Sequence, residues 1–260
     1  MTTPTIASMH RSTQALCTHL CQKQTLTQGI AYYNPDLPHD AEANQFREVV
    51  IGGAGDVREA FEEAETFFSE QGITCLRWAL AADQAADAIA PFLIEAGFVK
   101  RPLSAWLLTR WVDRAPPDDV RVLPARAMRS TLRRMFESAE SEPTRTDALE
   151  TCLRRMDDPQ YDMFVAMIGD QPAGRCALYQ VGDFARVTDL HVADGFDEKI
   201  VGHALLAHVL TMSKRLTMRK ILTLHREGED VRRAMLEEWG FVEDGRFDEF
   251  DRPRAGASEP

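Results

Sequence analysis

The sequence has 260 residues and carries 30 Lys and Arg against 41 Asp and Glu, a formal net charge of −11. That length is enough for one large domain or two modest ones, and apolar and charged fractions of 44% and 27% are typical of a globular protein. The negative charge argues against nonspecific nucleic-acid binding because a polyanion would be repelled. The lack of a run of about 18 apolar residues argues against a membrane span.

The N-terminal stretch lacks an apolar core flanked by charge, so no secretion signal is expected. Five cysteines are scattered along the chain, which favours a reduced, cytoplasmic setting. Cys17, His19 and Cys21 raise the question of a metal site. On a helix, however, His19 does not share the face of the two cysteines, and a fourth ligand at zinc spacing is missing, so no metal is predicted.

The first part of the chain is expected to begin with a long helix, whose apolar stripe contains Ile6, Met9, Leu16 and Leu20. The expected elements are a helix at 5–28, an irregular stretch at 29–45, a strand at 48–51, a helix at 56–70, a strand at 75–80, a helix at 83–96 that Gly97 closes, and a strand at 102–111.

Residues 115–119 are the best candidate linker, because Pro116 and Pro117 stop any regular element there. The elements expected after it are a strand at 120–123, helices near 126–140 and 145–157, a hairpin of strands 161–168 and 173–180, a strand up to Val192, a helix from Glu198, a strand at 220–224, a helix at 229–239 and a strand near 242–250. Residues 253–260 are expected to be disordered.

The stretch 185–204 is the part of the chain most typical of a functional site. Apolar side chains alternate up to Val192, Asp194 and Gly195 are typical of a turn, and apolar residues recur every three or four positions from Val201. A strand that leads through a short loop into a helix leaves backbone N–H groups at the helix N-terminus, and these attract phosphate. We therefore expect the site here.

Two pairs of segments indicate a duplicated unit. Residues 93–98 are similar to residues 236–241, both ending in Gly-Phe, and residues 48–53 are similar to residues 191–196, with an offset of 143 in both cases. The first copy is expected to lack the early helices and the hairpin of the second.

Residues 118–250 resemble the GNAT acetyltransferase superfamily in the order strand, two helices, antiparallel hairpin, central strand, long helix, strand, helix, strand. Residues 190–192 are similar to the end of the family's fourth strand, and residues 200–206 occupy the place of its acetyl-CoA pyrophosphate loop. Residues 229–241 resemble its last helix with the Gly-Phe ending, and residues 47–111 are similar to a partial unit.

The resemblance implies an α/β fold (α+β, with a mixed sheet), namely the GNAT-like acyl-CoA N-acyltransferase fold. It also implies that two GNAT-like units follow one another in tandem. The expected division is a partial unit without a cofactor loop at 1–113, an acetyltransferase unit at 118–252 and the tail at 253–260. Acetyl-CoA is the implied co-substrate. The residues expected to contact it are Leu190, Val192, Glu198, Lys199, Ile200, Val201, Gly202, His203 and Ala204.

In such a site an amine attacks the thioester carbonyl, which is held by a backbone N–H of the fourth strand. That strand must bulge or part from its neighbour to leave the N–H free. Asp189 and His191 are the candidates for the general base; without a bulge they lie on one side of the strand, opposite Arg186. Alternatively, His191 is a partly buried strand residue and Asp189 pairs with Arg186 or a neighbouring strand. Tyr161 and Tyr179 belong to the hairpin; the alternatives for them are to line an acceptor cleft or to pack in the core, and packing is expected.

Several positions depart from the family pattern. Of the three key loop positions, Asp197, Ile200 and Gly202, only the glycine conforms. The Asp197 carboxylate is expected to cap the helix and to repel a diphosphate by roughly 1 to 3 kcal/mol at about 5 Å. Leu236 replaces the family's tyrosine acid, and Glu229 replaces an asparagine. A coenzyme A thiol with a pKa of about 8.5, like that of cysteine, is a tolerable leaving group without an acid.

The sequence thus predicts an acetyl-CoA-dependent N-acetyltransferase that acts on an amine of a small molecule or a protein, with the first unit shaping the acceptor cleft. The alternative is a catalytically degenerate copy of the fold that binds a ligand or partner without chemistry. A homodimer is compatible with either function.

Overall fold

The computed structural model describes residues 3–84, 86–139 and 144–253. The strands in this part of the chain are β1 (Gln22–Thr25), β2 (Ile30–Tyr33), β3 (Gln45–Val49), β4 (Arg77–Leu80), β5 (Val99–Leu108), β6 (Val120–Pro124), β7 (Tyr161–Ile168), β8 (Gln171–Val181), β9 (Phe184–Val192), β10 (Lys220–Arg226) and β11 (Phe241–Asp251). The helices are α1 (Pro4–Leu20), α2 (Ala54–Glu70), α3 (Ala90–Glu95), α4 (Arg129–Ala139), α5 (Thr144–Arg155), α6 (Glu198–Arg215) and α7 (Asp230–Glu238), with 3-10 turns η1 (Ala86–Ala88) and η2 (Ala125–Ala127).

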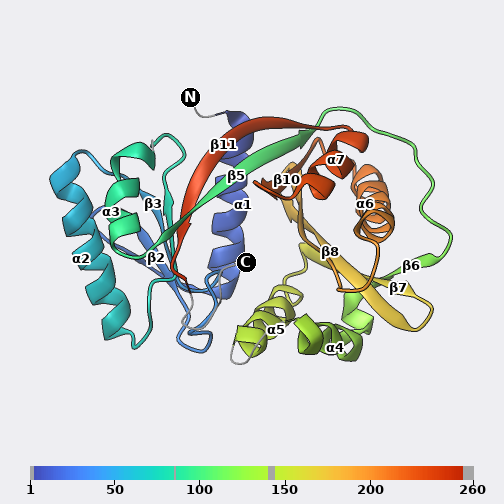
Figure 1. Cartoon of the computed structure of the whole chain (residues 1–260), viewed down its shortest axis with the longest axis horizontal. Helices are drawn as coiled ribbons and strands as arrows, with labels where there is room; N and C mark the ends of the chain where they lie inside the picture. The colour runs from blue at the N-terminus through green and yellow to red at the C-terminus, as the bar shows by residue number, and fades with distance from the viewer. Residues whose placement is uncertain (1–2, 85, 140–143, 254–260) are drawn as a thin grey trace.

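These strands form one mixed sheet in the order β1-β2-β3-β4-β11-β5-β10-β9-β8-β7-β6, with helices packed against it (Figure 1). The predicted mixed α/β sheet is confirmed. The order is nearly symmetric about the antiparallel pair β5 and β11, since β3 runs parallel to β4 and β9 runs parallel to β10. The last strand of each half pairs with the other half, β5 with β10 and β11 with β4. The boundary between the two predicted units stays a prediction.

The helices enclose separate apolar cores. Helices α2 and α3 cover the sheet of the first half over a core that includes Phe46, Phe68 and Trp78. In the second half, α6 and α7 pack on a core that includes Leu205 and Trp239, and α4 and α5 pack on another core at the hairpin β7–β8. Helix α1 lies between the halves, against the central strands (Figure 1).

The first helix is shorter than predicted and is followed by a strand. It ends at Leu20, and residues predicted as its last two turns form β1, which pairs with β2 in an antiparallel hairpin. The predicted absence of a hairpin from the first copy is therefore wrong. The stretch predicted to be irregular at 29–45 contains β2 at its start, but residues 34–44 have no helix or strand, as predicted. The side chains of Gln22–Thr25 are all exposed, so β1 depends on ladder hydrogen bonds and has no apolar face that a pattern would reveal.

The helix predicted at 83–96 is broken into η1 and α3. Pro91 explains the break, because proline is tolerated in the first turn of a helix but not in its interior. Gly97 follows α3 with a φ of 88°, which confirms its predicted capping role. The hairpin β7–β8 and helix α6 are also confirmed.

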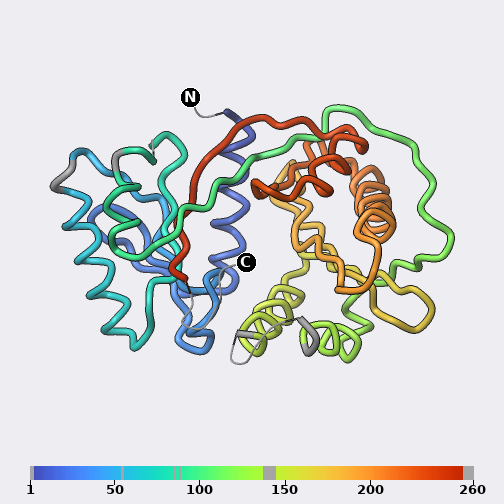
Figure 2. Tube along the Cα trace, in the orientation of Figure 1, coloured from blue at the N-terminus to red at the C-terminus, as the bar shows by residue number. Residues whose placement is uncertain are grey.

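Residues 109–119 contain no helix or strand, as the predicted linker requires, and they run around the outside of the second half from β5 to β6 (Figure 2). No helix in the described part of the chain is both long and apolar enough to span a membrane. Of the tail predicted to be disordered, residues 254–260 lie outside the described residues.

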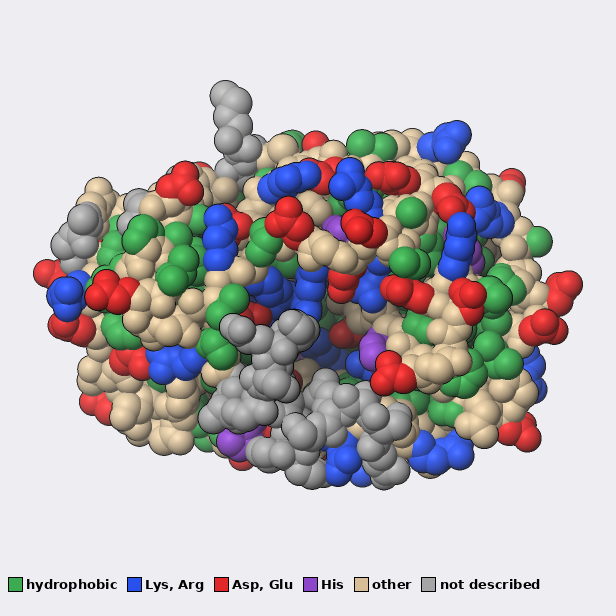
Figure 3. Space-filling view, in the orientation of Figure 1, with side chains coloured by type: hydrophobic (Ala, Val, Ile, Leu, Met, Phe, Trp, Pro, Cys, Tyr) green, Lys and Arg blue, Asp and Glu red, His purple; other side chains and the backbone are tan. Residues whose placement is uncertain are grey.

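Two buried arginines of the first half, Arg47 and Arg77, form ion pairs beside α1 that connect them to β11 and to Glu42. Arg47 of β3 donates to Glu249 of β11 at 3.0 Å, and Arg77 of β4 donates to Glu42 and to Asp251, each at 2.6 Å. Burial alone would raise the pKa of Glu249. The positive charges of Arg47 and Arg77 outweigh that effect, so the pKa of Glu249 lies below its usual value. On the face of the molecule seen in Figure 3, charged side chains gather around a hollow in the middle.

Candidate active site

The parallel strands β9 and β10 part at their carboxyl ends. Their pairing ends at Val187 and Thr223, although β9 continues to Val192 and β10 to Arg226. A cavity of about 400 Å³ lies at this opening and is lined by residues 187–191 of β9 and by three residues of β10. The carboxyl ends of neighbouring parallel strands are a common place for a ligand site in mixed sheets.

Asp189 forms a β-bulge in β9. Its φ of 53° lies in the left-handed region, and the register with β8 shifts so that Asp189 and Leu190 stand opposite Cys176 alone. A non-glycine residue in this conformation costs about 1 kcal/mol or more, and such strain is typical of functional sites. Glu48 in β3 has a φ of 55°, so the equivalent strand of the first half carries the same kind of residue.

The bulge changes which side chains share a face. Arg186 pairs with Tyr179 across β8 and β9, and Tyr179 pairs with Tyr161 across β7 and β8, so these three side chains lie on one face. The Tyr161 hydroxyl donates a hydrogen bond to Asp189, which therefore lies on that face too. The opposite placement of Arg186 and Asp189, which was expected only without a bulge, does not apply here because the bulge resets the alternation. Arg186 instead donates to two hydroxyl groups of α1.

Asp189 is held from two sides and still reaches the cavity. Besides the Tyr161 hydrogen bond, Arg155 Nη1 lies 3.8 Å from its carboxylate, and the side chain of Asp189 remains 28% exposed. Burial, then Asp189, raises the pKa of Tyr161 well above its usual value, so the phenol stays protonated and donates. The predicted packing role of Tyr161 is thus incomplete, and neither Tyr161 nor Arg155 was identified from the sequence as a partner of Asp189.

Two backbone N–H groups of β9 face the opening. Beyond the bulge His191 pairs with Arg175 of β8, and the N–H of Ala193 donates to the carbonyl of Ala173 at 2.9 Å. Alternate N–H groups of a strand point to opposite neighbours. Those of Leu190 and Val192 therefore point away from β8, toward the side where β10 has departed.

His191 lines the same cavity and is half-buried. Burial, followed by the charges of Arg175 and Arg232, lowers its pKa to about 4. The imidazole is therefore neutral near pH 7 and has a free lone pair, but its affinity for a proton is low.

The first turn of α6 presents both free and occupied N–H groups. The Asp197 carboxylate accepts from the N–H of Ile200 at 2.9 Å and thereby caps the helix, as predicted. The N–H groups of Glu198 and Lys199 have no hydrogen-bond acceptor within the described residues. The side chain of Lys199 forms an ion pair with Glu238 at 3.0 Å.

The side chains of the second turn of α6 face the protein interior. Val201 and Ala204 are fully buried, and Trp239 Nε1 donates to His203 Nδ1 at 2.7 Å. A Cβ atom at Gly202 would lie 2.6 Å from Met235 Sδ, so the end of the Met235 side chain packs directly on this glycine and would have to shift for any larger residue. These four residues therefore offer a ligand little beyond their backbone, and their predicted contact with acetyl-CoA stays a prediction.

Leu236, which stands at the family's tyrosine position, lines the cavity between β9 and β10 and is only 1% exposed. Glu229 lies at the rim of the same cavity and accepts from Arg232 at 3.0 Å. The opening therefore contains no phenol at the Leu236 position that could protonate a leaving group.

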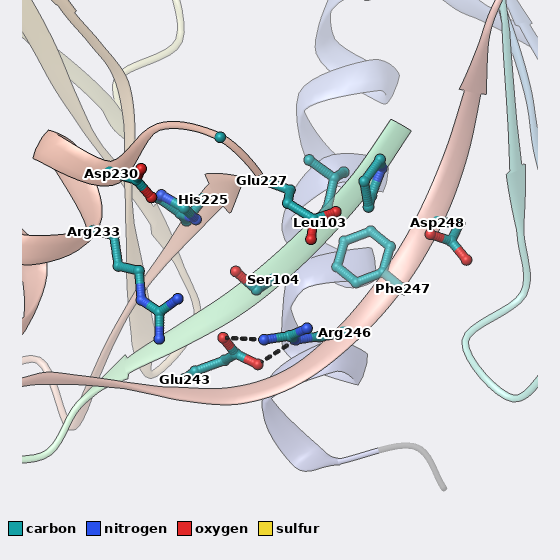
Figure 4. A pocket seen from close by; sticks show the side chains of 12 residues that line it. Leu103, Ser104, His225, Glu227, Asp230, Arg233, Glu243, Arg246, Phe247 and Asp248 are labelled. Carbon is teal, nitrogen blue, oxygen red and sulfur yellow. Dashed lines mark hydrogen bonds and ion pairs between the residues drawn. The ribbon is translucent and has the colours of Figure 1, made fainter. Parts of the chain in front are cut away.

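Another cavity, of about 440 Å³, lies between β5, β11 and the start of α7 (Figure 4). Glu243 and Arg246 form an ion pair in it, and Phe247 packs beside Leu103. Carboxylates outnumber cations in its lining, and it contains none of the predicted site residues.

The cysteines considered for a metal site have other partners. Gln45 donates to Cys17 Sγ at 3.0 Å, and Cys21 Sγ donates to the carbonyl of Ala43 at 3.3 Å. Burial raises the pKa of the Cys17 thiol to about 11, which disfavours the thiolate that a metal needs. Within residues 3–253, apart from 85 and 140–143, no group of three His, Cys, Asp or Glu side chains is placed to hold a metal ion.

Comparison with known proteins gives a family match for the second half of the chain. Residues 125–241 match the model of the acetyltransferase (GNAT) family. No curated protein matches the chain.

Solved structures resemble nearly the whole chain. One is a functionally unknown conserved protein from Staphylococcus epidermidis, with a TM-score of 0.68 at 15% identity over 89% of this chain and 94% of that one. A GCN5-related N-acetyltransferase from Kribbella flavida has a TM-score of 0.65 at 11% identity over 96% of both chains. A GCN5-related N-acetyltransferase from Sphaerobacter thermophilus has a TM-score of 0.58 at 14% identity over 87% of this chain and 81% of that one. At these identities the likeness establishes the fold alone.

Proposed function

Because residues 125–241 match the model of the acetyltransferase (GNAT) family, we propose that the chain is an acetyl-CoA-dependent N-acetyltransferase whose acceptor amine attacks the thioester directly. The observation that carries the proposal is the opening between β9 and β10 beside the bulge at Asp189. The N–H groups of Leu190 and Val192 face this opening, where they are suited to hold a carbonyl oxygen on which negative charge develops.

The residues present fit the thioester end of acetyl-CoA well and its diphosphate less well. Acetyl-CoA supplies the acetyl group as a thioester, and the parted strands offer it two N–H groups and an apolar wall that includes Leu236. At α6 the N–H groups of Glu198 and Lys199 are available to a diphosphate, but the Asp197 carboxylate occupies the N–H of Ile200 and repels anions.

The proposed reaction forms a bond between the amine nitrogen and the acetyl carbon and breaks the bond from that carbon to sulfur. An amine that enters as ammonium loses two protons overall: one goes to the base or to water, and the other goes to the sulfur, so that coenzyme A leaves as its thiol. Asp189 lines the cavity beside the opening, so it is placed to hold the incoming ammonium group and to accept its proton directly or through water. The lowered pKa of His191 makes its imidazole a weak base, so Asp189 is proposed as the base for its position at the opening and for its negative charge, which attracts the ammonium group.

The first half of the chain is proposed to shape the acceptor cleft. A cavity of about 430 Å³ is lined by Glu42 and Arg77 of the first half and by Arg155 and Asp189 of the second. The amine would then approach the opening through a cleft that neither half forms alone, and we propose residues 1–113 and 118–252 as the two units.

A degenerate copy that binds a ligand without chemistry is the competing proposal. The capped N–H of Ile200 and the lack of a phenol at Leu236 favour it. A panel of amines separates the two, with thiol release from acetyl-CoA as the readout. Thiol release with some amine supports the transferase, whereas saturable binding of acetyl-CoA without release for any amine supports the degenerate copy.

The base assignment is tested by Asp189→Asn and His191→Ala, with the exposed Asp183→Asn as a matched control. We expect Asp189→Asn to lower kcat by about 10²- to 10⁴-fold without changing the Kd for acetyl-CoA. His191→Ala should have a smaller effect. Should neither substitution change the rate relative to Asp183→Asn, the assignment is wrong.

A further inference from the structure

A charged cleft lies between the two halves of the chain, next to the opening of β9 and β10. The cavities of about 400 and 430 Å³ described above are adjacent. They share the lining residues Glu42, Arg155, Arg175, Asp189 and Arg226. Together the two cavities are lined by eight arginines and five carboxylates, in a chain whose net charge is −11. The cleft therefore concentrates positive charge in an otherwise acidic protein (Figure 3).

Most of these arginines already have carboxylate partners. Arg77 pairs with Glu42, and Arg232 pairs with Glu229. Arg101, Arg155 and Arg252 are likewise paired with carboxylates. Paired arginines hold the walls of the cleft together and leave little charge for a ligand.

Three arginines of the cleft, Arg175, Arg186 and Arg226, have no carboxylate partner within the described residues. Arg186 is 9% exposed, donates only to Ser12 and Thr13 and has a buried Nε without a partner. The guanidinium of Arg175 lies 4.3 Å from the ring centroid of Phe136, and its buried Nη1 has no acceptor. Arg226 is exposed and lines both cavities.

These groups converge on the bulge. Arg175 stands directly opposite His191 in the β8–β9 ladder, Arg186 lies three residues before Asp189, and Arg226 ends β10 on the other side of the opening. A guanidinium that lacks a carboxylate binds a carboxylate or phosphate through paired hydrogen bonds. Asp189 lines the same two cavities as Arg175 and Arg226 and supplies a negative charge there, which can bind an ammonium group.

From this arrangement we infer that the cleft binds a small amine that also carries an oxyanion, a carboxylate or phosphate, with the oxyanion on the unpaired arginines and the amine toward Asp189. That this molecule is the acyl acceptor depends on the proposed function. It specifies compounds of amino-acid type, and it disfavours simple polyamines, which would meet the unpaired arginines with like charge.

Matched pairs of amines test the inference with the full chain and saturating acetyl-CoA. The pairs are serine against ethanolamine, phenylalanine against phenethylamine, and phosphoethanolamine against ethanolamine; the third pair distinguishes phosphate from carboxylate. We expect the member of at least one pair that carries the oxyanion to have a kcat/KM for thiol release at least about tenfold higher. Arg175→Gln and Arg226→Gln should each raise KM for that member about 10- to 100-fold, with KM for acetyl-CoA unchanged. The control Arg219→Gln removes an exposed arginine outside the cleft.

The outcomes separate this inference from the proposed function. Thiol release that is equal or faster with the members that lack an oxyanion, or that is insensitive to both arginine substitutions, overturns the inference and leaves the transferase intact. Should acetyl-CoA neither bind nor react, the proposed function fails. Calorimetric titration with serine and phosphoserine then tests, without acetyl-CoA, whether the cleft binds an amine that carries an oxyanion. Binding that weakens in Arg226→Gln but not in Arg219→Gln supports it, and no binding of either compound overturns it.

Discussion

Replacing Asp197 by asparagine separates two effects of this residue. The carboxylate caps α6 by accepting from the N–H of Ile200, and it also places a negative charge where we propose that a diphosphate binds. Asparagine and aspartate are about equally good N-caps. Asp197→Asn should therefore preserve the helix and remove only the charge, whereas Asp197→Ala should also lose about 1 kcal/mol of unfolding free energy.

The size of the charge effect follows from the exposure of the residue. Asp197 is exposed, so the dielectric constant of water applies, and two unit charges about 5 Å apart interact by about 0.8 kcal/mol. A diphosphate carries about two charges, and physiological salt screens over roughly 8 Å, which leaves about 1 kcal/mol. Asp197→Asn should thus lower the Kd for acetyl-CoA by about fivefold.

Calorimetric titration with acetyl-CoA at low and high salt measures this effect. The gain in affinity should shrink as salt rises, and Asp194→Asn, which removes an exposed carboxylate that does not cap the helix, should give a smaller gain. Unchanged or weaker binding in Asp197→Asn at low salt would refute the placement of the diphosphate at α6.

Three further predictions concern the surroundings of the site. Gly202→Ala brings a Cβ within 2.6 Å of Met235 Sδ, so the buried end of Met235 must shift; the substitution should lower the free energy of unfolding by about 1–3 kcal/mol in urea, and by less when it is made in a Met235→Ala background, whereas an unchanged midpoint contradicts it. Glu249→Gln leaves Arg47 buried without its carboxylate and should cost about 3–5 kcal/mol, whereas the double replacement Arg47→Met with Glu249→Leu should cost less; equal losses would contradict this. The folded pKa of His191, about 4, lies below the unfolded value of about 6.5, so its contribution to stability is present above pH 6.5 and is lost as the pH falls toward 4. His191→Gln should flatten this dependence in unfolding measurements at pH 7 and 5, and an equal slope in both proteins argues against it.

The sequence was sufficient to predict elements whose side chains pack against a core. The hairpin β7–β8 and helix α6 carry regular apolar periods, and each begins and ends at turn or capping residues such as Gly169 and Asp197. The strand β1 could not be predicted in this way, because its residues Gln22–Thr25 are exposed and their partner β2 determines their conformation.

The surroundings of Asp189 could not be predicted because they depend on a break in a regular pattern. A bulge has no signature in the side chains at Asp189 and Leu190, yet it decides that Arg186 and Asp189 share a face. The contacts of Asp189 with Tyr161 and Arg155 join residues about 30 positions apart, and only the folded sheet brings them together.

The most direct test of the account is amide hydrogen exchange of the full chain with and without millimolar acetyl-CoA. We predict slower exchange at residues 188–192 of β9 and at 197–201 at the start of α6, because the N–H groups there would bind the thioester carbonyl and the diphosphate. Unchanged exchange in both segments, or protection confined to the cavity between β5 and β11, would contradict the proposal that the opening between β9 and β10 is the acetyl-CoA site.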